Sequence, residues 1–262
     1  MSRTLRVVTA VARELWLPVL LIAAWWWFSA GSTSLYWPPL ADITDRFVDL
    51  WFFEHLVDDA LPSVIRLVSG FGIGFAVAVL LGLLLGSVPA LEDATRPLVE
   101  FMRALPSVAL LPIMMLLLGT GDDMKVVTIA FVSTWPILLN TVEGVRSVDP
   151  VLHRVAAGYR LSTWHRIRYL IVPAAMPQVF AGARVALSMS VVAMVLTEML
   201  GSPGGLGYFV LDSQRTFDIV AMWTGLIVLG LIGYAANKAF GLVEARVLAW
   251  HRGFTKQKED QR

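Results

Sequence analysis

The chain has 262 residues, of which 57% are hydrophobic and only 16% are charged, and its mean hydropathy is +0.69. Because soluble domains carry about 25% charged residues, this composition indicates a membrane protein. The formal net charge of +1 excludes a strongly basic nucleic-acid-binding protein on bulk grounds. The absence of cysteine excludes disulfides, thiolate metal sites and cysteine nucleophiles, and the four scattered histidines predict no metal site.

Six apolar segments are long enough to approach the roughly 20 residues that a helix needs to cross a bilayer. They are Leu15–Ala30, Leu61–Val88, Leu98–Leu118, Met124–Val142, Gln178–Leu200 and Ile219–Ala239. The first follows Arg3, Arg6 and Arg13 and contains Trp25, Trp26 and Trp27 without a small-residue cleavage site, so we interpret it as an uncleaved anchor. The predicted fold is therefore an all-α polytopic membrane protein with six transmembrane helices.

The basic residues predict the orientation of these helices, because Lys and Arg in short loops are retained on the cytoplasmic side. Most of the 21 basic residues lie on one side if both termini are cytoplasmic. Only Arg46, Arg66, Lys125 and Arg215 are then expected at or near the outer face.

Two features of the first half of the chain predict local structure. Residues 41–60 interleave acidic and aromatic side chains, which is typical of an amphipathic helix at the outer interface. In the second segment, Gly70 with Gly74 and Gly82 with Gly86 have the four-residue spacing that allows helices to pack closely in lipid.

A basic segment, Arg154 to Pro177, separates two apolar runs and contains no acidic residue. Within the connection at about 143–177, residues 151–159 and 164–172 are predicted to form two short helices, with Ser162 and Thr163 as an N-cap between them. Pro173 and Pro177 are expected to end the second helix and to start the next crossing. The arginines suit either anionic lipid or docking of a cytoplasmic partner, and composition does not choose between them.

The sequence offers no enzymatic chemistry. It lacks the glycine-rich phosphate loop G-x-x-x-x-G-K-[ST], and no triad or pair of carboxylates stands out within the apolar segments. Glu198 stands out because an ionisable side chain within a predicted crossing is costly. It is either a structural carboxyl bonded to a neighbouring helix or part of a gate. Trp135-Pro136, Pro106 and Pro112 are expected to kink or open their helices.

Four stretches together resemble the permeases of type I ABC importers, in the branch that handles nitrate, sulfonate and taurine. They are HLVDDALPSVIRLVSGFGIGFAVAVLLGLLLG, MRALPSVALLPIMMLLLGTGDDMK, the segment from NTVEGVRSVD through L-S-T-W to LIVPAAMPQVFAGARVAL, and TEMLGSPGGLGYFV. The resemblance covers roughly Leu56 to Val220 and implies the MetI-like permease fold with a cytoplasmic coupling loop.

The resemblance also implies partners and sites. The basic segment would be the coupling loop that fits a groove on a cytoplasmic ABC ATPase, present in two copies, which would bind ATP and Mg²⁺; this chain itself would need no cofactor. A second permease chain, in a homodimer, and an extracytoplasmic solute-binding protein would complete the importer, which would contact membrane lipid and no nucleic acid. The expected coupling residues are Arg154, Val155, Ala156, Ala157, Gly158, Tyr159, Arg160, Leu161, Ser162, Trp164 and Pro173. The expected pathway and gate residues are Ser133, Thr134, Trp135, Asn140, Ser188, Ser190, Met194 and Glu198, and the expected loop facing the binding protein contains Gly204, Gly205 and Gly207.

The chain departs from the family pattern at two positions of the coupling loop. The family's loop begins with Glu and two small residues and has Gly four residues after the second, whereas this chain has Arg154, Val155 and Ala156, followed by Arg160. Because arginine tolerates a positive φ poorly, we expect either the turn or the partner's groove to differ.

We divide the chain into an N-terminal helix with an outer interfacial segment (1–57), a five-helix permease core (58–240) and a cytoplasmic tail (241–262). The expected location is the bacterial inner membrane, with both termini cytoplasmic. The expected solute is a sulfonate, taurine or nitrate-like anion, and the alternatives are a neutral or aromatic compound such as a pyrimidine. A non-transporting scaffold or sensor that recruits a cytoplasmic partner is the alternative from another class; a secondary transporter would require an inverted repeat and more ionisable groups in the membrane.

Overall fold

The computed structural model describes residues 3–52, 55–201 and 203–250, and every regular element in these ranges is a helix. Of the predicted tail (241–262), residues 241–247 continue the last long helix, and the residues from His251 onward lie outside the described residues. The elements, with two π-helical turns labelled η, are α1 (Arg3–Ser29), α2 (Leu40–Trp51), η1 (Leu56–Ala60), α3 (Leu61–Ser87), α4 (Pro89–Ala104), α5 (Ser107–Leu118), α6 (Asp122–Arg146), α7 (Pro150–Gly158), α8 (Thr163–Arg166), η2 (Ile167–Ile171), α9 (Val172–Gly201), α10 (Leu206–Arg215) and α11 (Ile219–Val247).

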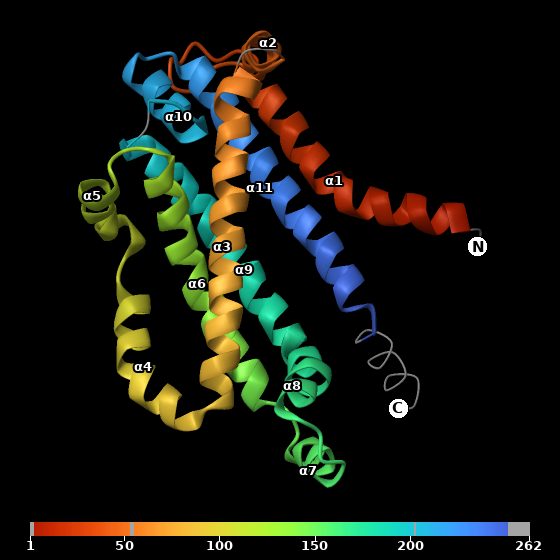
Figure 1. Cartoon of the computed structure of the whole chain (residues 1–262). Helices are drawn as coiled ribbons and strands as arrows, with labels where there is room; N and C mark the ends of the chain where they lie inside the picture. The colour runs from red at the N-terminus through yellow and green to blue at the C-terminus, as the bar shows by residue number, and fades with distance from the viewer. Residues whose placement is uncertain (1–2, 53–54, 202, 251–262) are drawn as a thin grey trace.

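The centre of the molecule is a group of three long helices, in which α6 packs against both α3 and α9 (Figure 1). Small residues allow the close approach, as predicted for the glycines of α3. A Cβ atom added to Gly70 would lie 2.6 Å from Cβ of Ile129, and one added to Gly82 would lie 2.5 Å from Cβ of Thr141. The interior is therefore held by van der Waals contact between backbones, which is the main source of helix association in lipid.

The predicted crossings are found with two differences. Among the described residues, four helical segments are long and apolar enough to cross a bilayer, and they correspond to the second, fourth, fifth and sixth predictions: Leu56–Ser87, Asp122–Arg146, Thr163–Gly201 and Ile219–Val247. The third prediction corresponds to α4 and α5, which are bent by 99° relative to each other at a break next to Pro106. The apolar stretch of α1, Trp16–Ser29, is shorter than the roughly 20 residues of a full crossing.

We expected Pro173 and Pro177 to end one helix and start the next, but the helix is not interrupted at either proline. The chain remains helical from Thr163 to Gly201, and the π-helical turn η2 precedes Pro173. In that turn, the N–H of Val172 donates to the carbonyl oxygen of Ile167, five residues back, so the helix has already changed its hydrogen-bonding register where the proline lacks a donor. The same arrangement is found at η1, where Leu61 donates to Leu56 just before Pro62.

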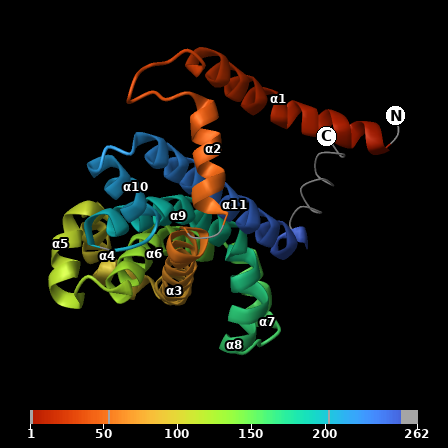
Figure 2. The same ribbon diagram turned by 90° about the horizontal axis from the view of Figure 1, so that it is seen from above.

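The two ends of the bundle carry different short elements (Figure 1). The helices α2 and α10 cover one end, which we name the α2–α10 end, and α7 and α8 project from the other. α2 forms as predicted, and Nε1 of its buried Trp51 donates to Oγ1 of Thr224 in α11 at 2.9 Å. Seen from above, α1 lies apart from the three central helices (Figure 2), and Trp25, Trp37 and Trp223 cluster where it begins to diverge, with ring centroids 5.4–5.8 Å apart.

Candidate functional site

The first candidate site is the helical hairpin that projects from the bundle, named here the α7–α8 hairpin (residues 149–171). Its first helix begins at an N-cap, because Oδ1 of Asp149 accepts the N–H of Val151 at 2.7 Å. The helix ends in a Schellman motif, in which the N–H groups of Arg160 and Leu161 donate to the carbonyl oxygens of Ala157 and Ala156, both at 3.0 Å. The predicted first short helix is thus confirmed, and it ends sharply.

Arg160 occupies the turn position of this motif and has a φ of 50°. This left-handed region usually belongs to glycine, because a Cβ atom crowds the neighbouring carbonyl oxygen there. We expected either the turn or the partner's groove to differ, since arginine tolerates positive φ poorly; the turn itself is kept, because Arg160 adopts the left-handed conformation. The substitution therefore keeps a tight turn at the expense of backbone strain and adds a positive charge at its tip.

Two side-chain interactions fix the second half of the hairpin. Oγ of Ser162 accepts the N–H of His165 at 3.4 Å, which confirms the predicted N-cap. The guanidinium of Arg166 donates to Nδ1 of His153, with Nη2 at 2.7 Å, and this bond joins α8 to α7. The hairpin is consequently a defined structural unit rather than an extended loop.

The surface of the hairpin exposes aromatic and basic groups together. Tyr159 is 79% exposed and Trp164 is 64% exposed, although both are large and partly apolar. Of the predicted coupling residues, Ala156 is buried and Pro173 lies at the start of α9, where it is partly buried. The others are exposed on the hairpin: Arg154, Val155, Ala157, Gly158, Tyr159, Arg160, Leu161, Ser162 and Trp164.

The second candidate site is a buried polar cluster near the α2–α10 end, centred on Glu198. The carboxylate of Glu198 is fully buried and accepts a hydrogen bond from Nη1 of Arg66 at 2.7 Å. The hydroxyl of Ser63 lies 2.8 and 2.9 Å from its two oxygens, and the N–H of Gly207 donates at 3.0 Å. Of the two roles considered for Glu198, this geometry favours the structural one.

Arg66 extends this cluster to α6. Its Nε donates to Oδ1 of Asp122 at 2.8 Å, and Nζ of Lys125, whose side chain is only 2% exposed, lies 3.2 Å from the same oxygen. We expected both cations at or near the outer face; they lie near the α2–α10 end, where the structure buries them. Long-range pairing of this kind leaves no periodic signal in the sequence.

The glycine-rich loop before α10 is fastened to the same cluster. Gly205 has a φ of 108°, a conformation that favours glycine, and its N–H donates to Oδ1 of Asp59 at 2.8 Å. The next N–H, that of Leu206, donates to the hydroxyl of Ser63 at 3.0 Å. The loop therefore forms a tight turn, and it is attached to both α3 and α9.

The residues predicted to line a pathway do not share one surface. Ser133, Thr134, Ser190 and Met194 are buried where the three central helices meet, and the hydroxyls donate to carbonyl oxygens of their own helices. Asn140 and Trp135 are partly buried, and Ser188 is exposed. Of these, only Trp135 lines the open side of α6 and α9, whereas Asn140 packs against Gly182 of α9.

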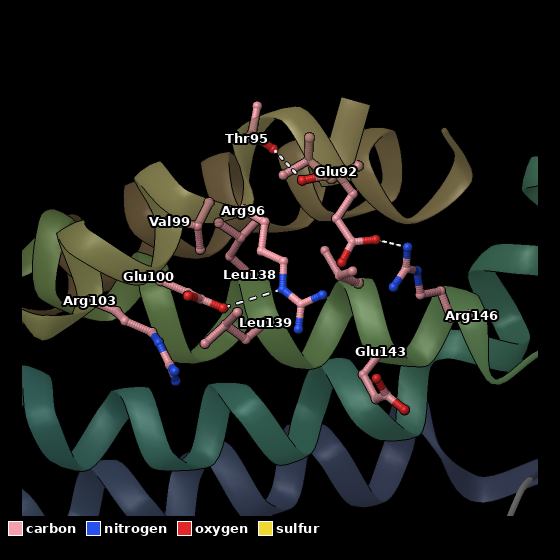
Figure 3. Close-up of a pocket in the computed structure, with 12 residues that line it drawn as sticks. Glu92, Thr95, Arg96, Val99, Glu100, Arg103, Leu138, Leu139, Glu143 and Arg146 are labelled. Carbon is pink, nitrogen blue, oxygen red and sulfur yellow. Dashed lines mark hydrogen bonds and ion pairs between the residues drawn. The ribbon is translucent and has the colours of Figure 1, made fainter. Parts of the chain in front are cut away.

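Sequence reasoning missed a cleft of about 570 Å³ on that open side. It is bounded by the end of α4, the α4–α5 break, α6 and α9, and its wall includes Arg103, Trp135 and Met189. A second cleft, of about 230 Å³, adjoins it between α4 and α6. Figure 3 shows that charged side chains line this second cleft, with ion pairs between Glu92 and Arg146 and between Arg96 and Glu100.

Comparison with known proteins identifies the family. The family model of the binding-protein-dependent transport system inner membrane component matches residues 74–249. The chain belongs to this family. That match spans the second half of α3, the whole of α6 and α9, the α7–α8 hairpin, the glycine-rich loop and α11.

Individual relatives in the family carry different solute names. The chain is 27% identical over 246 residues to the putative aliphatic sulfonates transport permease protein SsuC of Bacillus subtilis (strain 168), covering 92% of this chain and 88% of that protein. It is 30% identical over 186 residues to the nitrate import permease protein NrtB of Synechocystis sp. (strain ATCC 27184 / PCC 6803 / Kazusa), covering 71% and 68%. It is 29% identical over 237 residues to the bicarbonate transport system permease protein CmpB of Synechococcus elongatus (strain ATCC 33912 / PCC 7942 / FACHB-805), covering 86% and 82%.

The fold is shared with a solved transporter. The MetNI methionine ABC transporter, in an inward-facing conformation, superposes with a TM-score of 0.66 at 19% identity, covering 76% of this chain and 97% of that one. The chain is therefore an ABC importer permease subunit of the sulfonate, nitrate and bicarbonate type, with an all-helical MetI-like fold.

Proposed function

We propose that this chain forms the translocation pathway of an importer for a small anion. The names of three relatives support this solute class, because sulfonates, nitrate and bicarbonate are all compact anions. In this proposal two copies of the chain assemble as a homodimer in the bacterial inner membrane, with both termini cytoplasmic and with α1 as an additional crossing. An external binding protein delivers the anion near Gly204, Gly205 and Gly207.

The observation that carries the proposal is the α7–α8 hairpin. Tyr159 and Trp164 stand exposed among arginines on a rigid hairpin, and an exposed patch of aromatic and basic groups is typical of a protein-binding surface. The hairpin is the unit that would enter a groove on each of two cytoplasmic ATPase subunits, which bind ATP and Mg²⁺. Closure of the ATPase pair would then draw the two hairpins together and change which face of the pathway is open.

The pathway itself would lie on the open side of α6 and α9, opposed by the same side of the second copy. Trp135 and Met189 line the cleft there, and Asn140 and Ser188 are not fully buried. Ser133, Ser190 and Met194 would then support the pathway from behind, inside the helix packing.

The test is purification of the tagged full chain from its native membrane in mild detergent, followed by mass identification and stoichiometry. The proposal requires a phosphate-loop ATPase at one copy per permease chain. Trp164→Ala should reduce the amount recovered, whereas Tyr234→Ala, which removes a similarly exposed aromatic side chain from α11, should leave it unchanged. A partner without ATP-binding motifs would instead support a membrane scaffold or sensor.

A further inference from the structure

Arg103 lies at an unusual place for a charged residue. It is in the last turn of α4, directly before the 99° break between α4 and α5, and it lines the 570 Å³ cleft. The cleft is bounded by residues 131–139 of α6 and by Val185 and Met189 of α9, which are central positions of two helices long enough to cross the bilayer. Arg103 therefore adjoins the middle of these helices, and it also lines the second cleft, which reaches Arg146 at the end of α6.

Two carboxylates that line the clefts together with Arg103 are paired with other groups. Glu100 lines the same cleft, but its Oε1 lies 3.3 Å from Nε of Arg96, and Glu92 pairs with Arg146. Within the part of the chain that the structure describes, Arg103 makes no ion pair or side-chain hydrogen bond, and Figure 3 shows its guanidinium directed away from α4. Glu100 and Arg103 are the charged residues of the 570 Å³ cleft, and Glu100 is engaged by Arg96 outside it; Glu143 is the remaining carboxylate of the second cleft, which Arg103 also lines.

A second donor is also without a partner. The indole ring of Trp135 lines the cleft, and its Nε1 is buried with no hydrogen-bond partner. A buried unsatisfied donor is unfavourable by about 1–3 kcal/mol. The rest of the wall is mainly apolar, with Phe131, Val132 and Leu139 from α6. A guanidinium and an N–H donor in an apolar wall match the chemistry of an anion, not that of a cation.

The location supports the same conclusion. A charged side chain at the level of the membrane interior is costly and marks functional sites by default, and helices that are interrupted midway are used by transporters to hold solutes. The cleft volume is also within the roughly 300–1,000 Å³ of small-molecule sites.

From these observations we infer that Arg103 and Trp135 form an anion-binding site in the permease itself, at the α4–α5 break. The site takes compact oxyanions such as sulfonate or nitrate: the guanidinium donates to two oxygens, and the indole N–H, which is buried in this structure, donates to a third when the ring turns toward the cleft. This inference deepens the proposed function and names the residues that would recognise the solute within the membrane.

The experiment measures anion binding without transport. The full chain, together with whatever partner chains accompany it, is placed in lipid nanodiscs, and the ¹⁹F line width of trifluoromethanesulfonate is recorded against its concentration. We expect broadening above that of empty nanodiscs, reversal by excess methanesulfonate or nitrate, and no broadening of the neutral probe 2,2,2-trifluoroethanol. Arg103→Gln should weaken binding by roughly tenfold or more, because a charge-assisted bond is lost.

Three further variants separate binding from folding. Arg103→Lys keeps the positive charge but not the two-pronged geometry of the guanidinium, so it should bind the anion at an intermediate level. Trp135→Phe removes the indole N–H but keeps an aromatic ring at this position, so it should weaken binding by a smaller factor. Lys238→Gln removes an exposed cation from α11 and should bind like the wild type. Equal binding by wild type and by a folded Arg103→Gln chain would overturn the inference, as would broadening no greater than in empty nanodiscs.

The outcome is independent of the proposed function. Recovery of the ATPase without anion binding would reject the site and keep the importer. Anion binding that depends on Arg103 without any ATPase would keep the site and reject the importer.

Discussion

Arg66 and Glu198 are 132 residues apart in the sequence, and their side chains meet at 2.7 Å inside the bundle. The pair joins α3 to α9, and Asp122 on the other side of the guanidinium adds α6 to the connection. All three central helices are therefore tied together near the α2–α10 end by one arginine. The glycine-rich loop rests on the same groups through the N–H of Gly207.

Glu198→Gln should destabilise the chain. Glutamine keeps the shape but not the charge, and removal of one member of a buried ion pair costs about 3–5 kcal/mol because the other charge is left uncompensated. Asp122 still faces Arg66, so we expect about 3 kcal/mol in the free energy of unfolding, measured by denaturation in mixed micelles. Asp93→Asn, on an exposed position of α4, should change it by less than about 0.5 kcal/mol.

A double-mutant cycle tests the pair itself. Arg66→Gln with Glu198→Gln should be less destabilising than the sum of the two single variants, because neither charge is then left alone. An additive result would mean that the two side chains do not stabilise each other. Normal stability of Glu198→Gln together with altered transport would instead assign Glu198 to a gate.

The helices of this chain were predictable because their signals are local. Long apolar runs predicted α3, α6, α9 and α11, Ser162 predicted its cap, and the glycines of α3 predicted the close packing against α6. Each of these features depends on residues that are neighbours in the sequence or one helical turn apart.

The polar interior was not predictable for the opposite reason. From the sequence, Arg66 and Lys125 are expected only to lie near the outer face. Their pairing with Asp122 and Glu198 depends on the packing of three helices. The cleft beside Arg103 likewise depends on the angle at the α4–α5 break. Pro106 predicted a kink but not its direction, so the position of the arginine could not be derived.

Gly74→Ala and Gly72→Ala form a matched pair on one helix. A Cβ at Gly74 would collide with the side chain of Ser133 and lie 2.6 Å from the carbonyl oxygen of Ala130, whereas a Cβ at Gly72 would have nothing within 4 Å. We expect Gly74→Ala to destabilise the chain by roughly 1–3 kcal/mol through overpacking. Gly72→Ala should be neutral or stabilising by up to about 1 kcal/mol, because alanine favours the helix. Equal thermal midpoints for the two variants would contradict the observed α3–α6 contact.

Arg160→Gly should stabilise the turn of the α7–α8 hairpin. A residue other than glycine in the left-handed region costs about 1–2 kcal/mol. Replacement by glycine removes this cost, but part of the gain is lost because glycine gives the unfolded chain more conformational entropy. The amide of Leu161, which donates to Ala156 across the turn, should exchange its hydrogen roughly threefold to tenfold more slowly. Arg154→Gly, inside α7, should have the opposite effect and accelerate exchange by a similar factor.

Arg160→Glu separates charge from backbone in the proposed docking to an ATPase. Glutamate and arginine carry similar strain at a φ of 50°, so reversal of the charge should leave the stability of the hairpin nearly unchanged while it weakens any contact with acidic groups on the partner. We expect at least a tenfold loss of ATPase recovered with the chain at low salt, since a like-charge contact replaces an attractive one. Arg160→Gln should lie between the two, and the difference among the three chains should shrink as the salt concentration rises, because exposed charges are screened. Recovery that is the same for all three chains at every salt concentration would place the contact elsewhere on the hairpin, with Tyr159 and Trp164 as the remaining candidates for the docking surface.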